Sequence, residues 1–116
     1  MSVRNDRIRK ALIKEISDII QHHIRDPRIS GIVSVTDIEL SSDYRYAKIY
    51  ISIYGSEEEK EQTMEIIESS TPYIRREIGK RIRLRHTPEL EFRRDDSIEK
   101  GSRITDLIDK ISKGEL

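Results

Sequence analysis

A dense group of basic side chains lies between Pro72 and His86. Of the seven charged residues in this stretch only Glu77 is acidic, so its local charge is +5 in a chain whose formal charge is zero. Phosphate backbones attract lysine and arginine, and the planar guanidinium group of arginine suits phosphate oxygens. A solvated helix face is the simpler alternative, but such a face usually mixes both signs. We predict that these bases contact RNA: Arg75, Arg76, Lys80, Arg81, Arg83 and Arg85.

Two further charged segments bear on this prediction. The first predicted helix carries a basic stripe that would extend the RNA-binding surface, although acids lie between its members: Arg7, Lys10 and Lys14. The segment from Glu57 to Glu68 holds six acids and one lysine, a local charge of −5. Separated charge blocks predict a molecule with a positive side and a negative side.

Residues with catalytic potential are few. The chain has no cysteine, which excludes thiolate zinc sites and a cysteine nucleophile. His22 and His23 are adjacent and would point about 100° apart on a helix, so they do not form a simple metal site. The acids at 37, 39 and 43 lie close to a predicted turn, and no Walker-type glycine loop or nucleophile elbow is found. The sequence therefore predicts no enzyme, no cofactor and no metal.

A row of tyrosines is open to two interpretations. Tyr46, Tyr50 and Tyr54 lie on one face of the second predicted strand. The apolar residues lie on its other face: Ala47, Ile49, Ile51 and Ile53. Aromatic side chains on an exposed sheet can stack unpaired bases. Tyrosine also favours half-exposed strands because it packs well against cross-strand neighbours.

The length of 116 residues suits one domain, which we place at 1–112 with a frayed tail at 113–116. Charged residues make up 38% of the chain, but the apolar residues are strongly periodic, which predicts a folded protein. No apolar run approaches the roughly 20 residues of a membrane helix, and the N-terminus resembles neither a signal peptide nor a transit peptide. These features predict a monomer in the cytoplasm.

The bases need elements that position them, and the apolar pattern defines these elements. The segment 4–25 has the apolar spacing of a helix. Its buried stripe would be Ile8, Leu12, Ile16, Ile19 and His23, widened by Ile13, Ile20 and Ile24, with His23 at the edge of the core. A hairpin follows, from a strand that begins near Gly31 and a strand over 44–54. The alternation of the first strand slips between Val35 and Ile38, which predicts a bulge near Thr36–Asp37.

A helix–kink–helix follows the hairpin. Ser56 is the predicted N-cap of a helix that ends near Ser69 or Ser70. Thr71 precedes a proline and is disfavoured in helical geometry, so the next helix should begin at Pro72. Its core stripe would be Ile74, Ile78 and Ile82, with Arg76, Lys80 and Arg83 on the far side. The sequence does not define where this helix ends, because residues 81–85 also show the alternation of a strand.

The last elements are a strand over 89–93 and a helix that begins after Asp96. Leu90 and Phe92 should face inward on the strand. Glu99 would complete a capping box with Asp96, and the buried stripe of this helix would be Ile104, Leu107, Ile108 and Ile111. The order predicts an α+β fold with a three-stranded mixed sheet and helices on one face.

The ordered motifs of the chain resemble bacterial ribosome-binding factor A. The matching runs are I-R-x-x-I-G-x-R-I-x-L-R at Ile74–Arg85, T-P-E-L-x-F at Thr87–Phe92 and D-x-S-x-x-x-G-x-R-I at Asp95–Ile104. The N-terminal half is similar to the same family, so the resemblance spans nearly the whole chain. No motif is unique alone, but the ordered set is specific.

This resemblance implies a KH-like fold of type II order, α-β-β-α-kink-α-β, with a C-terminal helix. It implies a non-enzymatic factor that binds free small (30S) ribosomal subunits and 16S rRNA. Such a factor supports late maturation and 5′-end processing, notably in the cold. A helix kink replaces the G-x-x-G loop of ordinary KH domains. Here the kink would be Ser70, Thr71 and Pro72, with proline where the family usually has glycine, which predicts a stiffer kink.

Two other functions stay open from the residues alone. The acidic helix 57–68 would suit a module that docks a basic protein partner. A metal-dependent nuclease that uses Asp37 and Asp43 is the weaker alternative.

Overall fold

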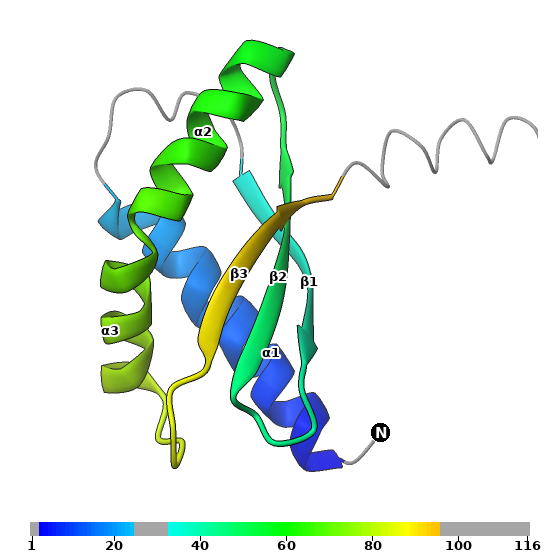
Figure 1. The fold of residues 1–116 in the computed structure, drawn as a ribbon, viewed down its shortest axis with the longest axis vertical. Coiled ribbons are helices and arrows are strands. Elements are labelled where there is room, and N and C mark those ends of the chain that lie inside the picture. Colours follow the sequence, from blue (N-terminus) through cyan, green and yellow to red (C-terminus); the bar gives the residue numbers. More distant parts are fainter. Residues whose placement is uncertain (1–2, 25–32, 96–116) are drawn as a thin grey trace, which may run out of the picture.

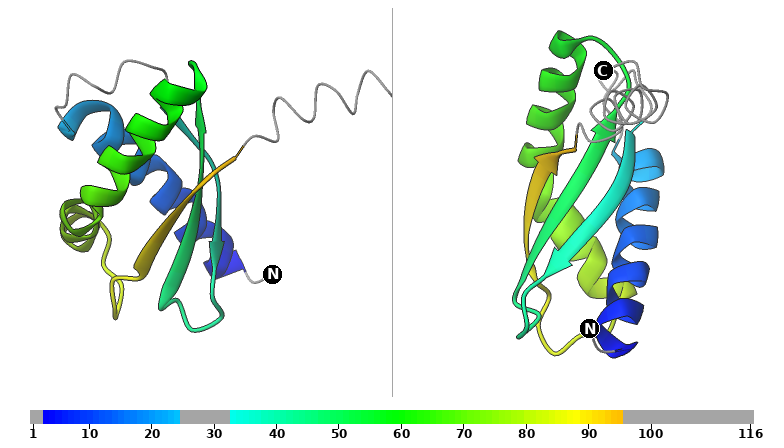
Figure 2. Two further views of the ribbon diagram at one scale, coloured as in Figure 1. Left: turned by 45° about the horizontal axis from the view of Figure 1, so that its top comes forward. Right: turned by 90° about the vertical axis from the view of Figure 1, so that its right-hand side faces the viewer.

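The computed structural model describes residues 3–24 and 33–95. The elements in chain order are α1 (Val3–Asp18), a π-helical turn (Ile19–His23), β1 (Val33–Leu40), β2 (Tyr46–Ile53), α2 (Glu57–Ser69), α3 (Thr71–Arg81) and β3 (Glu89–Arg94). All the helices pack against one face of a three-stranded sheet (Figures 1 and 2). The predicted α+β fold is confirmed. The predicted C-terminal helix, the tail 113–116 and the end of the first helix at Arg25 lie outside the described residues.

The first helix differs from its prediction near its C-terminal end. Leu12, Ile16 and Ile19 are buried, as the 3/4 spacing predicts, but the helix widens into a π-helical turn after Asp18. The amide of Ile24 donates to the carbonyl oxygen of Ile19 at 3.1 Å, and Ile24 is already extended. Both isoleucines of this turn, Ile19 and Ile20, are buried, as predicted. His23 is exposed, so its predicted place at the core edge is wrong.

The hairpin has the predicted alternation and the predicted bulge. β1 and β2 are antiparallel, and the register shifts between Val35 and Asp37, which leaves Thr36 as the extra residue. Ala47, Ile49 and Ile51 of β2 face the helices and are buried. β2 ends at Ile53, so Tyr54 lies beyond the strand rather than on it.

The predicted break between the second and third helices is present at Ser70. The side chain of Ser56 accepts from the amide of Glu59, which completes a capping box at the start of α2. At the other end of α2, the hydroxyls of Ser69 and Thr71 donate to the carbonyl oxygens of Ile66 and Ile67. Both carbonyl oxygens also accept from the amide of Ser70, so the hydroxyls add a second bond to each at the end of the helix.

The third helix begins one residue earlier than predicted. Thr71 is its first residue and Pro72 lies in its first turn, where a missing amide costs nothing. α3 runs in a different direction from α2 and is seen nearly end-on in the left view of Figure 2. Ile74 and Ile78 are fully buried, as predicted.

The region after α3 is neither the continued helix nor the strand over 81–85 that the sequence predicts. α3 ends at Arg81, Ile82 is extended and half-buried, and residues 83–88 form a loop rather than helix or strand. Arg83 therefore lies on this loop and not on the helix. The loop leads into β3, which pairs parallel to β2, so the sheet is mixed with the order β1-β2-β3. Phe92 is buried and Leu90 packs against the core, as predicted.

Candidate nucleic-acid interface

The predicted bases of residues 75–85 fall into two groups, and Arg75 belongs to the group bound within the protein. Its Nε donates to the carbonyl oxygen of Pro88 at 3.1 Å, and its Nη2 donates to that of Thr87 at 2.9 Å. Nη2 also lies 3.4 Å from the carboxylate of Glu89. Arg75 therefore joins α3 to the loop 83–88 and to the start of β3.

Arg81 is the second base of this group. Its Nη1 donates to Asp18 at 2.7 Å and to Glu15 at 3.1 Å, which ties the end of α3 to α1. These bonds, that to Asp18 first, raise the pKa of Arg81, and the guanidinium holds the pKa of Asp18 below its usual range. The side chain of Arg81 is only 22% exposed. Its geometry is that of a link between helices rather than of a surface contact.

The other four bases point away from the protein. Arg76 and Lys80 are exposed on α3, and Arg83 and Arg85 are exposed on the loop. Lys80 lies 4.0 Å from Glu77, the distance of a weak surface ion pair. Within residues 3–24 and 33–95, the three arginines have no hydrogen-bond or ion-pair partner, so their charge is available to a ligand.

A shallow depression of about 540 Å³ brings bases from α3 and the loop together. Its lining residues are Pro72, Arg75, Arg76, Gly79, Arg85, His86 and Thr87. Three arginines and no carboxylate line it, so it presents a concentrated positive charge to solvent. The fork of arginine and this density of charge suit the oxygens of phosphate groups.

Gly79 explains how the loop can lie so close to α3. A Cβ built at this position would lie 3.1 Å from Oγ1 of Thr87, which is tighter than ordinary packing. From the sequence, this mid-helix glycine indicates either a close approach by another backbone, that of the helix 57–68 or of the sheet, or a tolerated bend. The neighbour is instead the loop 83–88.

The basic stripe of α1 is only partly available. Lys10 forms an ion pair with Asp6 at 3.2 Å, whereas Arg7 and Lys14 are exposed and have no partner in the described part of the chain. A second depression is lined by Ile8 of α1, by Asp43 and Tyr44 of the hairpin turn, and by Leu84, Arg85 and His86, so the first turns of α1 lie beside the basic loop. Both lie at the same end of the molecule (Figure 1). Arg7 precedes Ile8 in this part of α1 but lines neither depression, and Lys14 lies about two turns further along α1.

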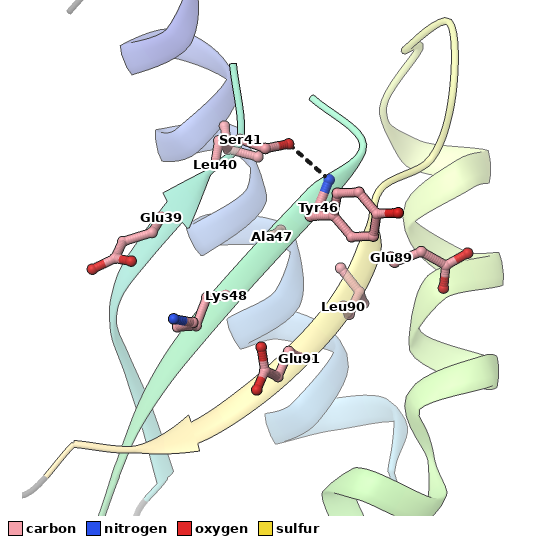
Figure 3. A pocket seen from close by; sticks show the side chains of 9 residues that line it. All are labelled: Glu39, Leu40, Ser41, Tyr46, Ala47, Lys48, Glu89, Leu90 and Glu91. Atoms are coloured by element: carbon pink, nitrogen blue, oxygen red, sulfur yellow. Dashed lines mark hydrogen bonds between the residues drawn. The ribbon is translucent and has the colours of Figure 1, made fainter. Parts of the chain in front are cut away.

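The tyrosine face of the sheet mixes acids and bases. Glu39, Lys48 and Glu91 lie side by side across the three strands and line a depression of about 290 Å³ with the exposed Tyr46 (Figure 3). The hydroxyl of Tyr50 donates to Glu39 at 3.1 Å. The alternation places four acids and two bases on this face: Asp37, Glu39, Glu89 and Glu91 with Lys48 and Arg93. Asp37 pairs with Arg9 of α1 at 2.6 Å, and Glu89 lies 3.4 Å from Arg75 of α3. Arg93 pairs with Glu91 at 2.7 Å, and Lys48 lies between Glu39 and Glu91. The face therefore offers phosphate no surplus of positive charge, which favours strand packing over base stacking for these tyrosines.

Sequence reasoning did not separate the two anchored arginines from the exposed ones. The signal for Arg81 is present in the i, i+3 pair Glu15 and Asp18 on α1, but their meeting with α3 depends on tertiary packing. Sequence reasoning also missed His86 and Thr87, which line the depression. Among residues 3–24 and 33–95, no group of three acidic or histidine side chains could hold a metal ion. No helix in these ranges is long and apolar enough to span a membrane.

Comparison with protein families places this geometry among known proteins. A family model described as "Ribosome-binding factor A" matches residues 4–108. The chain is 51% identical over 115 residues to ribosome-binding factor A of Caldanaerobacter subterraneus subsp. tengcongensis, a match that covers 99% of this chain and 94% of that protein. It is 51% identical over 112 residues to the protein of the same name from Clostridium tetani, with 97% and 93% covered.

Solved structures show the same fold. An NMR structure of a putative ribosome-binding factor A from Thermotoga maritima has a TM-score of 0.69 at 34% identity, with 81% of this chain and 89% of that chain covered. The crystal structure of ribosome-binding factor A from Thermus thermophilus has a TM-score of 0.67 at 22% identity, with 77% and 92% covered. A homology model of the Thermus thermophilus factor, fitted into the map of a 30S complex, has a TM-score of 0.60 at 22% identity, with 81% and 93% covered.

Proposed function

This chain belongs to the ribosome-binding factor A family, and we propose that it binds the small ribosomal subunit through the basic end of the molecule. Membership of a non-enzymatic family of subunit maturation factors agrees with the function predicted from the sequence. The surface proposed for the rRNA backbone consists of the four exposed bases Arg76, Lys80, Arg83 and Arg85, extended by Arg7.

The observation that carries this assignment is the depression beside α3. Arg76 comes from the helix and Arg85 from the loop, and both reach the depression without a carboxylate partner in the described residues. Surface arginines usually find nearby acids in a chain with equal numbers of acids and bases. Here no carboxylate lines the depression, although Asp43, Glu77 and Glu89 lie on the surface around it. Bases that are kept apart from acids support an anionic partner.

The two anchored arginines have a different place in this proposal. Arg75 and Arg81 are held by contacts within the protein, so we withdraw them from the set of direct RNA contacts. Lys10 and Lys14 contribute less, because Lys10 is paired with Asp6 and Lys14 lies further from the loop. They add to the long-range positive potential of this end rather than to a defined contact.

The test is co-sedimentation of the protein with free small subunits and, separately, with assembled ribosomes, together with binding to purified small-subunit rRNA. We expect association with free small subunits and with the rRNA, and an affinity that falls as salt rises. RNA cleavage in the presence of Mg²⁺ would favour the nuclease alternative. The absence of any affinity for subunits and rRNA would refute the proposal.

One observation keeps the protein-interaction module as a second candidate. Four glutamates at 3/4 spacing form one exposed stripe of α2 and have no partner within residues 3–24 and 33–95: Glu58, Glu61, Glu65 and Glu68. Such a stripe could meet a basic protein surface. Binding to subunits that persists unchanged after loss of the exposed arginines, but fails after loss of these glutamates, would select this candidate.

A further inference from the structure

The loop 83–88 carries half of the proposed phosphate contacts, yet it has almost no hydrogen bonds of its own. Within the described residues, none of its backbone amides or carbonyls bonds to another backbone group. Backbone–backbone bonds stop at Ile82, whose amide donates to Ile78, and resume at Glu89, whose amide donates to Arg45. A loop without such bonds is ordinarily a mobile part of a protein.

Arg75 supplies the two hydrogen bonds that this loop does make in the described structure. Its guanidinium reaches the carbonyl oxygens of Thr87 and Pro88 through two different nitrogen atoms. This geometry needs the planar fork of arginine, because a lysine ammonium is a single compact donor on a flexible stem. The contact with Glu89 at 3.4 Å adds a third point on the same side of the guanidinium.

Two other contacts hold the same end of the loop. Pro88 is fully buried, and Oγ1 of Thr87 lies where a side chain at Gly79 would intrude. Thr87 thus meets α3 at two positions one turn apart: its side chain lies at Gly79 and its carbonyl oxygen accepts from Arg75. Its neighbours in sequence, Arg85 and His86, are thereby brought to the rim of the depression that also contains Arg76.

We infer that Arg75 is a positioning residue, which acts on RNA binding by fixing the loop that carries Arg83, Arg85 and His86. The inference rests on the function proposed above and assigns a distinct role to one basic residue of the site. An ordered loop lowers the entropy lost when a ligand binds, so the gain comes from preorganisation and not from a further phosphate contact. A positive charge at position 75 is then not sufficient for full RNA affinity, because only the forked side chain of arginine can hold the loop in place.

The experiment compares four variants of the full chain: Arg75→Lys, Arg75→Gln, Arg76→Lys and Arg76→Gln. The first readout is the amide NMR spectrum of the free protein. We expect Arg75→Lys to shift or broaden the amide signals of residues 83–87, and the matched Arg76→Lys variant to leave them in place. The Arg75→Gln variant repeats the loss of the fork with a side chain that still carries a donor.

The second readout is the affinity for free small subunits across a salt series. The salt slope is the slope of the logarithm of the affinity against the logarithm of the salt concentration. We expect Arg75→Lys to lower the affinity about tenfold, the effect of losing one to two hydrogen bonds, and to leave the salt slope as in the parent. Arg76→Lys keeps the charge and should keep the parental salt slope, whereas Arg76→Gln should reduce the magnitude of that slope by about 0.7 to 0.9. Circular dichroism checks that every variant is folded.

Three results would overturn the inference. They are loop signals unchanged in Arg75→Lys, a parental affinity of this variant, or a loss of slope in Arg75→Gln equal to that in Arg76→Gln. The last result would make Arg75 a direct phosphate contact. If the parent binds neither subunits nor rRNA, the proposed function fails with the binding part of the inference, and the NMR comparison still decides whether Arg75 fixes the loop.

Discussion

The helices α2 and α3 are built alike on their buried sides and differently on their exposed sides. Met64 and Ile67 of α2 and Ile74 and Ile78 of α3 all enter one core. On the exposed sides, α2 presents four glutamates and α3 presents Arg76 and Lys80. The change of sign occurs across the single residue Ser70, which lies between the two helices.

This difference separates what makes the fold from what meets the partner. The apolar stripes would hold both helices on the sheet whatever their exposed charges. The exposed charges decide which helix a polyanion can approach. A phosphate backbone drawn to α3 and the loop 83–88 would be repelled along α2, so the break at Ser70 marks the border of the proposed interface.

The largest effect on subunit binding is expected when the break between α2 and α3 is removed. Replacement of both Thr71 and Pro72 by alanine removes the hydroxyl bond to Ile67 and restores an amide that can continue α2. The helix should extend through Ser70 and swing Arg76 and Lys80 relative to the sheet. We expect a folded protein whose affinity for small subunits is lower by roughly tenfold.

A Ser69→Ala variant is the control, because it loses a hydroxyl bond at the same helix end and keeps the break. It should bind like the parent. An unbroken helix in the double variant together with parental affinity would show that the angle between the helices has no part in binding.

Arg81 tests whether a base of this region can be purely structural. Arg81→Gln breaks the bonds to Glu15 and Asp18, and we expect Tm at neutral pH to fall by about 5 °C while the salt slope stays parental. Because the pKa of Asp18 is lowered in the folded protein, its contribution is present above the usual value of 3.8 and is lost as pH falls below it. The difference in Tm between variant and parent should therefore shrink at acid pH. A loss of salt slope at neutral pH would return Arg81 to the set of RNA contacts.

Gly79 tests the close packing of the loop on α3. In an open helix interior, Gly79→Ala should stabilise by about 1 kcal/mol. The contact with Thr87 opposes this gain, so we expect no increase in Tm. A clear increase in Tm by thermal unfolding would show that the site merely tolerates glycine and that the loop can move aside without cost.

The smallest effect on subunit binding is expected from substitutions on the exposed side of α2. Glu58→Gln together with Glu61→Gln removes two charges that have no partner in the described residues. Salt slope and Tm should match the parent, and affinity should rise by no more than about twofold through reduced repulsion. A marked loss of subunit binding in a salt series would instead select the acidic stripe as the docking surface.

Periodicity predicted most of the fold because each element buries one regular face. The core residues Leu12, Ile49 and Ile78 were identified in this way, and the slip of alternation placed the bulge at Thr36. The π-helical turn was missed because the apolar stripe, which includes Ile19 and Ile20, fits a regular helix equally well and carries no mark of the wider turn. The end of α3 was also ambiguous, since a basic–apolar alternation over 81–85 fits helix, strand and loop alike.

The site was predicted at the level of a charged segment and not of single residues. All six bases lie in one basic segment and look alike in the sequence. In the structure, Arg75 and Arg81 donate to acceptors that lie 12 or more residues away in the chain. Sequence spacing carries no information about such partners. The exposed arginines are recognised only when the partners of the others are known.

The central claim is that exposed bases of α3 and its following loop meet phosphate. The direct measurement is the salt dependence of small-subunit binding by a variant with Arg76, Lys80 and Arg83 all changed to glutamine, with circular dichroism as the folding control. These side chains are exposed and do not touch the core, so the variant should fold. Each lost contact should reduce the salt slope by about 0.7 to 0.9, and three by about 2 to 3. A folded variant whose salt slope equals that of the parent would contradict the account.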